Sequence, residues 1–221
     1  MKSIYTIERR YTLTERVVEQ IRQAISSGKL KPGDRLMEQD IADAMQIGRN
    51  AVREAFRCLE REGFLTITPF KGASITQHEP EEILQMFEAM GELEGTCARL
   101  AVLKMTPGDL EKIESLHEAL EDLYKAGAHR KYLEVNWALH EFIQKLAGNA
   151  VVSKLIDELR QKISLYRSKQ LYQPNRFESS ITEHRSLLDA FRKKDPEAAQ
   201  QRMRQHLLRQ AASLMRREAD E

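Results

Sequence analysis

Hydrophobic residues recur three and four positions apart along most of the chain, a spacing typical of amphipathic helices. In the first part of the chain this pattern predicts a helix that is capped by Thr14 and ends at Gly28. Two shorter helices are predicted within residues 38–62, separated by a tight break near Gln46–Gly48. After Gly63, two short runs rich in β-branched residues flank the sequence PFKG, which predicts a β-hairpin.

Beyond residue 80 the helical spacing continues without a strand pattern, and prolines and glycines mark the ends of successive segments. The predicted helices lie near residues 80–104, 107–126, 129–147, 150–172, 177–193 and 196–217. We therefore expect a mostly α protein made of two domains. They occupy residues 1–76 and 80–221, joined by a linker at 77–79, and the second is an all-α bundle of six helices.

Three helices followed by a hairpin, within about 65 residues, form the plan of a winged helix-turn-helix, whose second helix-turn-helix element enters the DNA major groove. On that helix Val52, Ala55, Phe56 and Leu59 form an apolar face. Arginines at positions 49, 53 and 57 lie four residues apart on another face, where like charges repel one another. A polyanion along this face would remove the repulsion, whereas the alternative is an ordinary solvated surface offset by nearby glutamates.

The composition indicates the class of protein but does not indicate its function. The 221 residues are 41% hydrophobic and 31% charged, which is ordinary for a globular protein, and the formal net charge is only +1. Residues 1–76 carry 13 Lys and Arg against 10 Asp and Glu, too small an excess to identify a nucleic-acid partner. Two cysteines make no disulfide framework, and no long apolar segment is present. We expect a cytoplasmic protein with no membrane contact.

The DNA-contacting residues are predicted around the start of the second short helix and the tip of the hairpin. Arg49 and Arg53 are the expected readers of guanine edges, because an arginine can donate two hydrogen bonds to the O6 and N7 atoms of guanine. The complete predicted set is Gln39, Gly48, Arg49, Asn50, Ala51, Arg53, Lys71 and Gly72. A dimer with two-fold symmetry would read a palindromic operator in double-stranded DNA.

Three histidines lie in the apolar stripes of three different helices of the bundle. Asn136 and His140 are one turn apart on one helix, and His184 and His206 lie on two others. A single histidine on an apolar face is usually a hydrogen-bonded core residue, but three on three helices predict a metal site. Imidazole suits zinc, nickel, copper or iron, and Asn136 could supply an oxygen ligand. His78, His117 and His129 are poorer candidates, since we place them in the linker, on a charged face and at a helix start.

The N-terminal stretch resembles the DNA-binding domain of the GntR family of bacterial transcription regulators. The matching runs are GKLKPGDRL, IADAMQIGRNAVREAFRCLEREGFL and PFKGASI. The second domain resembles the FCD ligand-binding domain of the FadR-like subgroup through NWALHEFIQKLAGN, ITEHRSLLDAFRKKD and MRQHL. The resemblance implies a homodimeric, ligand-responsive regulator, here expected to be a repressor. Its helical domain would mediate dimerisation and bind a small effector, commonly a carboxylate, beside a divalent metal.

The sequence departs from the family pattern in the recognition helix and in the metal and effector site. The family usually has Ser-Arg-Thr-Pro-Val-Arg at the recognition helix, whereas this chain has Gly48-Arg49-Asn50-Ala51-Val52-Arg53. An aspartate is usual where Asn136 stands, so the amide lacks its attraction for a cation. An arginine that often meets the effector carboxylate is replaced by Met90. We expect Met90 to line the effector site, with Arg160 or Arg167 as the alternative partners of the carboxylate.

Two other functions are compatible with a histidine site of this kind: a metalloregulator and a metal-dependent hydrolase. In a metalloregulator the metal itself would be the signal, and DNA affinity would depend on metal without an organic ligand. An enzyme using the site for metal-assisted hydrolysis is disfavoured. The pair His140-Glu141 resembles the start of a zinc protease motif, but Gln144 stands where its second histidine is required.

Overall fold

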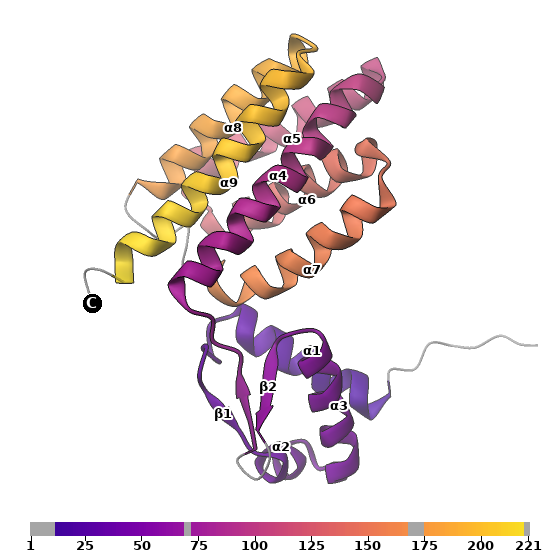
Figure 1. Ribbon diagram of the computed structural model, residues 1–221, viewed down its shortest axis with the longest axis vertical. Coiled ribbons are helices and arrows are strands. Elements are labelled where there is room, and N and C mark those ends of the chain that lie inside the picture. The colour runs from indigo at the N-terminus through magenta and orange to yellow at the C-terminus, as the bar shows by residue number, and fades with distance from the viewer. Residues whose placement is uncertain (1–11, 69–71, 168–174, 219–221) are drawn as a thin grey trace, which may run out of the picture. The chain divides into compact units, whose positions relative to one another are not determined.

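The computed structural model describes residues 12–68, 72–167 and 175–218, with side chains up to residue 214 except that of Arg167. The chain divides into two compact units, Met1–Gln77 and His78–Glu221, each of which is described by itself below (Figure 1). The expected fold class is confirmed, because the structure is mostly helical and its small sheet lies in the N-terminal unit.

The first unit is a three-helix domain with a small antiparallel sheet. Its elements in chain order are α1 Leu13–Ser26, β1 Arg35–Leu36, α2 Glu38–Met45, α3 Arg49–Arg61, β2 Leu65–Thr68 and β3 Gly72–Ile75. The sheet order is β1-β3-β2, and the hairpin of β2 and β3 pairs Leu65 with Ile75. Strand β1 was not predicted: only two residues pair with β3, which is too short for a sequence pattern to form.

The core of this unit lies where α1 and α3 pack together. Every residue of the predicted apolar face of α3 is buried, and so are the apolar positions of α1, which are Val17, Val18, Ile21 and Ile25. The predicted cap of α1 is wrong by two residues. Thr12, rather than Thr14, accepts a hydrogen bond from the backbone of Glu15, whose carboxylate accepts one in return from the backbone of Thr12. This reciprocal pair satisfies two groups that the helix end leaves unbonded.

The second unit is an antiparallel assembly of long helices. Its elements are α4 Pro80–Lys104, α5 Pro107–Lys125, α6 His129–Ala147, α7 Ala150–Arg167, α8 Arg176–Arg192 and α9 Pro196–Glu218. These bounds lie close to the predicted ones, and the predicted end of the fourth bundle helix, residues 168–172, lies outside the described residues. Within the described part of the chain, no helix is long and apolar enough to cross a membrane.

The closest helix pairing in this unit is that of α4 with α9, which lie side by side in Figure 1. Two glycines of α4, Gly91 and Gly95, allow the backbones to approach one another. A Cβ atom added at Gly95 would lie 3.0 Å from the backbone oxygen of Gln200 on α9. One added at Gly91 would lie 3.4 Å from the backbone oxygen of Arg204, which is nearly ordinary contact.

The two glycines therefore allow a matched test of this packing. We expect Gly95→Ala to lower the free energy of unfolding by about 1–3 kcal/mol, because the added methyl group forces the backbones apart. Gly91→Ala should be nearly neutral, since mild crowding is offset by a gain in helix propensity of up to about 1 kcal/mol. Thermal and urea denaturation of the two variants measure both values. Equal stability of the two variants would contradict the close approach at Gly95.

Candidate functional site

The N-terminus of α3 follows a turn with one left-handed residue and one extended residue. Gln46 ends α2 in the left-handed region, with φ of 54°, and Gly48 is the extended N-cap residue of α3. Gly48 has no side chain to accept a hydrogen bond from the free backbone N–H groups of this helix end. A Cβ atom at Gly48 would meet nothing within 4 Å, so glycine is not required there by space. The start of α3 is thus an open surface.

Arg49 and Arg53 are both about half exposed on this surface, and both face the carboxylate of Glu38, the first residue of α2. Hydrogen bonds from Arg53, opposed by slight burial, lower the pKa of Glu38. The hydrogen bonds to Glu38 in turn raise the pKa of the Arg53 guanidinium. The expected repulsion between the two arginines is therefore compensated within the protein itself.

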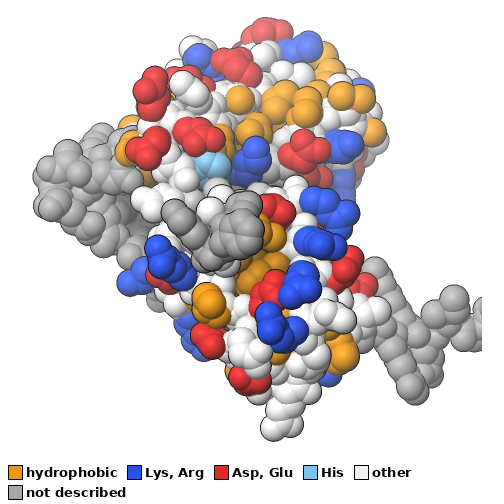
Figure 2. Space-filling view, turned by 60° about the horizontal axis from the view of Figure 1, so that its bottom comes forward, with side chains coloured by type: hydrophobic (Ala, Val, Ile, Leu, Met, Phe, Trp, Pro, Cys, Tyr) orange, Lys and Arg blue, Asp and Glu red, His pale blue; other side chains and the backbone are white. Residues whose placement is uncertain are grey.

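Several predicted DNA-contacting residues share one hollow of about 440 Å³. Gln39, Arg49 and Gly72 line it, together with the apolar residues Met37, Phe56, Ile67 and Ala73 and the carboxylate of Glu38. The starts of α2, α3 and β3 therefore meet at one surface, whereas Lys71 lies outside the described residues. In the view of Figure 2, basic side chains are interspersed with acidic ones. Charge density alone would not identify this surface.

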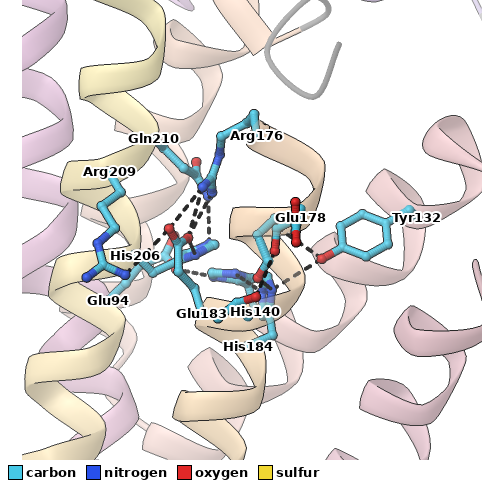
Figure 3. Close-up of polar contacts among 12 residues, drawn as sticks. Glu94, Tyr132, His140, Arg176, Glu178, Glu183, His184, His206, Arg209 and Gln210 are labelled. Atoms are coloured by element: carbon cyan, nitrogen blue, oxygen red, sulfur yellow. Dashed lines mark hydrogen bonds and ion pairs between the residues drawn. The ribbon is translucent and has the colours of Figure 1, made fainter. Parts of the chain in front are cut away.

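The second candidate site is a buried cluster of histidines in the other unit. His140 on α6, His184 on α8 and His206 on α9 are each at most 5% exposed. One nitrogen from each ring lies within 4.8 Å of the other two, and Figure 3 shows the three rings converging between the helices. The tertiary structure thus brings together the three histidines that the sequence singled out.

Each imidazole is held through its Nδ1 atom by an acceptor. His140 Nδ1 lies 2.5 Å from a carboxylate oxygen of Glu94, and His206 Nδ1 lies 2.7 Å from one of Glu183. His184 Nδ1 lies 2.8 Å from the backbone oxygen of Ser180. These acceptors favour the tautomer with hydrogen on Nδ1, in which the lone pair that can bind a cation is on Nε2. A carboxylate or carbonyl behind each metal-binding histidine is a recurrent arrangement in metalloproteins.

The spacing of two of these nitrogens fits a transition metal. The Nε2 atoms of His140 and His184 are 3.4 Å apart. A tetrahedral zinc ion with Zn–N bonds of about 2.1 Å would require about 3.4 Å between two ligand nitrogens. Asn136, one turn before His140, is buried, and its Oδ1 atom has no hydrogen-bond partner. An unsatisfied buried oxygen costs free energy, so a cation there would relieve a cost that the protein otherwise carries.

The cluster is embedded in buried ion pairs. Glu94 also accepts a hydrogen bond from Arg160 at 2.9 Å, and Glu183 is bound by both terminal nitrogens of Arg176. Burial opposes ionisation of Glu94, but His140 and Arg160 outweigh it and hold the pKa of this carboxyl well below its usual range. Burial, and then the neighbouring His206 and His140, lower the pKa of His184, so its ring is neutral.

Sequence reasoning missed the carboxylates and the cations behind the histidines. Glu94 lies on the otherwise apolar buried face of α4, and Glu183 directly precedes His184. A charged residue within an apolar stripe is a detectable signal, because such residues are rarely buried unless they are paired. Gln210 was also missed, and its side-chain nitrogen lies 2.6 Å from His206 Nε2. This amide would have to move away for that nitrogen to bind a metal.

The residues predicted to contact an effector have different environments. Met90 is fully buried in the apolar core. A methionine that packs in the core therefore occupies the position where the family usually has an arginine. Arg160 is buried, bonded to Glu94, and stacked 4.8 Å from the centre of the Trp137 ring. It also lines a hollow of about 950 Å³ beside α6 and α7. The side chain of Arg167 lies outside the described residues.

The expectation for one of the rejected histidines was wrong. His117 was placed on a charged helix face, yet it is only 6% exposed. Burial lowers the pKa of its imidazole. His117 does not belong to the cluster of three that could hold a metal ion among the described residues. It therefore offers a buried histidine for comparison with the cluster.

Comparisons with known proteins define the class. Residues 13–75 match the model of the bacterial regulatory proteins of the gntR family, and residues 85–209 match the FCD domain. The chain therefore belongs to the GntR family and carries an FCD domain. These domains are those of transcription regulators that bind DNA and respond to effectors, and not of enzymes.

Individual relatives agree with this class. The chain is 27% identical to the HTH-type transcriptional regulator YdhC of Bacillus subtilis, over 85% of this chain and 84% of that protein. It is 26% identical to the galactonate operon transcriptional repressor of Escherichia coli, over 85% of this chain and 90% of the relative. The solved structure of E. coli McbR/YncC has the same fold, with a TM-score of 0.76, 23% identity, and coverage of 95% and 100% of the two chains.

Proposed function

We propose that this transcription regulator is a repressor that reads a palindromic operator through the start of α3 and releases it when a small organic acid binds the helical unit. The observation that carries the DNA-reading role is the position of Arg49 and Arg53. They are the first residue of α3 and the residue one turn further, both exposed, and Arg49 shares a hollow with Gln39 and Gly72. Gly48, Asn50 and Ala51 are the neighbours that would adjust operator preference.

Removal of the two arginines tests this role. We expect the double variant Arg49→Ala/Arg53→Ala to lose operator affinity by roughly 1–3 kcal/mol for each guanine contact that disappears. A footprint or gel-shift on the promoter beside the protein's own gene measures the loss. The control is Arg61→Ala at the opposite end of α3, which removes one positive charge from the same helix, half of what the double variant removes. Undiminished operator binding by the double variant would contradict the assignment of the reading residues.

We also propose that His140, His184, His206 and the amide oxygen of Asn136 hold a divalent metal such as zinc or nickel. The support is the spacing of the His140 and His184 Nε2 atoms, the acceptors behind each Nδ1 atom, and the unsatisfied oxygen of Asn136. When bound, the metal supplies a Lewis-acidic position that an effector carboxylate can occupy. Galactonate, for which one similar repressor is named, is a hydroxy acid of this chemical type.

Metal content and thermal stability test this proposal together. We expect the purified protein to retain about one divalent ion per chain, because four protein ligands would hold it. Removing it with a chelator should lower the melting temperature, since a ligand that binds only the folded state stabilises that state. Asn136→Asp should bind the metal more tightly, because a carboxylate adds electrostatic attraction. Small hydroxy acids should raise the melting temperature only when the metal is present.

The matched control for the metal site is a pair of buried histidines. His184→Ala should abolish metal retention, whereas His117→Ala, outside the cluster, should retain the ion. Retention of metal by the His184 variant would overturn the proposed ligand set. DNA binding that depends on metal in the absence of any organic acid would favour a metalloregulator instead.

We propose that the protein is a homodimer and that α4 and α7 contribute to the dimer contact. Leu103 on α4 is 60% exposed, and Val151 and Leu155 on α7 are 72% and 44% exposed. These two helices pack against one another, so the exposed apolar residues lie on adjoining elements. Exposed apolar surface of this kind is a feature of protein–protein contacts. A dimer also supplies the symmetry that a palindromic operator requires.

Charge placed in the proposed contact should dissociate the dimer. We expect Val151→Glu/Leu155→Glu to sediment as a monomer, because burying unpaired carboxylates at an interface is unfavourable. Analytical ultracentrifugation of the wild type and the variant measures the change. Lys112→Glu/Lys125→Glu on the exposed surface of α5 adds at least as much negative charge and should remain dimeric. A wild-type protein that sediments as a monomer at micromolar concentration would refute the homodimer.

A further inference from the structure

The carboxylate of Glu38 binds one of the two proposed DNA-reading arginines through both of its oxygens. Arg53 Nε donates to Glu38 Oε1 at 3.1 Å, and Arg53 Nη2 donates to Oε2 at 2.9 Å. Two parallel hydrogen bonds between a guanidinium and a carboxylate fix the plane of the guanidinium. Arg49 Nη2 lies 3.6 Å from the same Oε2 atom, so Arg49 is attracted but not held in one orientation.

Glu38 does not occupy the end of the Arg53 guanidinium that recognises a base. A guanidinium has five N–H donors, and the side facing Glu38 uses the Nε donor and one of the two on Nη2. The remaining donors are both hydrogens of Nη1 and the second hydrogen of Nη2. These form the terminal fork that donates to the O6 and N7 atoms of guanine. Arg53 can therefore keep its bonds to Glu38 while it contacts a base pair.

Glu38 also limits how the arginines interact with phosphate. Non-specific DNA binding arises from positive charges that neutralise phosphates regardless of sequence. A single carboxylate within ion-pair distance of both arginines lowers the net positive charge at the start of α3. Fixing the Arg53 plane also reduces the side-chain entropy that is lost when a base is bound. The same contact thus favours base reading and disfavours indiscriminate phosphate binding.

We propose that Glu38 is a positioning residue that determines operator specificity, by holding Arg53 for base reading and restraining non-specific binding. This inference rests on the proposed function of Arg53 as a base reader. It does not depend on direct contact between Glu38 and DNA. Glu38 is the less exposed partner, with 26% of its side chain exposed against 47% for Arg53, as expected for a residue that supports another from behind.

The test compares specific with non-specific binding. Full-length wild type and Glu38→Gln are titrated against an operator duplex and a scrambled duplex of equal length and composition. We expect the variant to bind the operator more weakly and the scrambled duplex at least as tightly, so that the affinity ratio falls about fivefold or more. Selection from an operator library randomised at each position should show relaxed preference at the base pair that Arg53 contacts.

Two further variants separate a positioning role from a general effect of charge or folding. Asp40→Asn removes the same charge from the same first turn of α2, so it controls for the loss of a favourable acid at a helix start. It should leave the affinity ratio and the base preference unchanged. In an Arg53→Ala background, Glu38→Gln should cause little further loss of base preference, because residues that act through one another are not additive.

Each outcome bears on a distinct claim. An unchanged affinity ratio and base preference in Glu38→Gln, with normal melting temperature, overturns the proposal. A rise in operator affinity that exceeds the rise for the scrambled duplex also overturns it, because Glu38 would then compete with the operator. If Arg53→Ala alone leaves operator binding intact, the proposed reading role of Arg53 fails instead. That result is distinguishable because it does not involve Glu38.

Discussion

The arrangement of the helices at the centre of the helical unit depends on the ion pairs of one buried carboxylate. Glu94 on α4 pairs with Arg160 on α7 and with His140 on α6, so one side chain joins three helices. Removing one partner of such a buried pair typically costs about 3–5 kcal/mol, because the other charge is left unpaired. These helices are therefore constrained to positions that keep the carboxylate satisfied, and the His140 ring is oriented as a result.

The same device recurs at two other planar side chains of this protein. Glu183, itself fixed by Arg176, holds the His206 ring, and Glu38 holds the Arg53 guanidinium. In each case a carboxylate binds one edge of a planar group and fixes its orientation. The difference between the sites is burial: the carboxylates in the helical unit are nearly inaccessible, whereas Glu38 is partly exposed. A side chain oriented inside the protein suits a small cation, whereas a side chain oriented at the surface suits a large polyanion.

Much of the fold could be predicted because helix periodicity is a local property. The apolar face of α3 from Val52 to Leu59 is buried as expected, and the helices of the second unit begin and end near the predicted residues. The two failures have different causes, one local and one long-range. Thr12 and Thr14 are equally suitable caps by type, and only the position of Glu15 decides between them. Strand β1 exists only because β3 is available to pair with it.

The sequence by itself determined that three histidines lie on apolar faces of three helices and that arginines begin the recognition helix. It also carried the family resemblance. Only the tertiary structure decided that the histidine rings converge, that Asn136 presents an unsatisfied oxygen, and that Glu38 meets Arg53 across a fifteen-residue separation. The physical reason is that periodicity fixes which face a residue occupies, whereas the partner across that face is set by how separate elements pack.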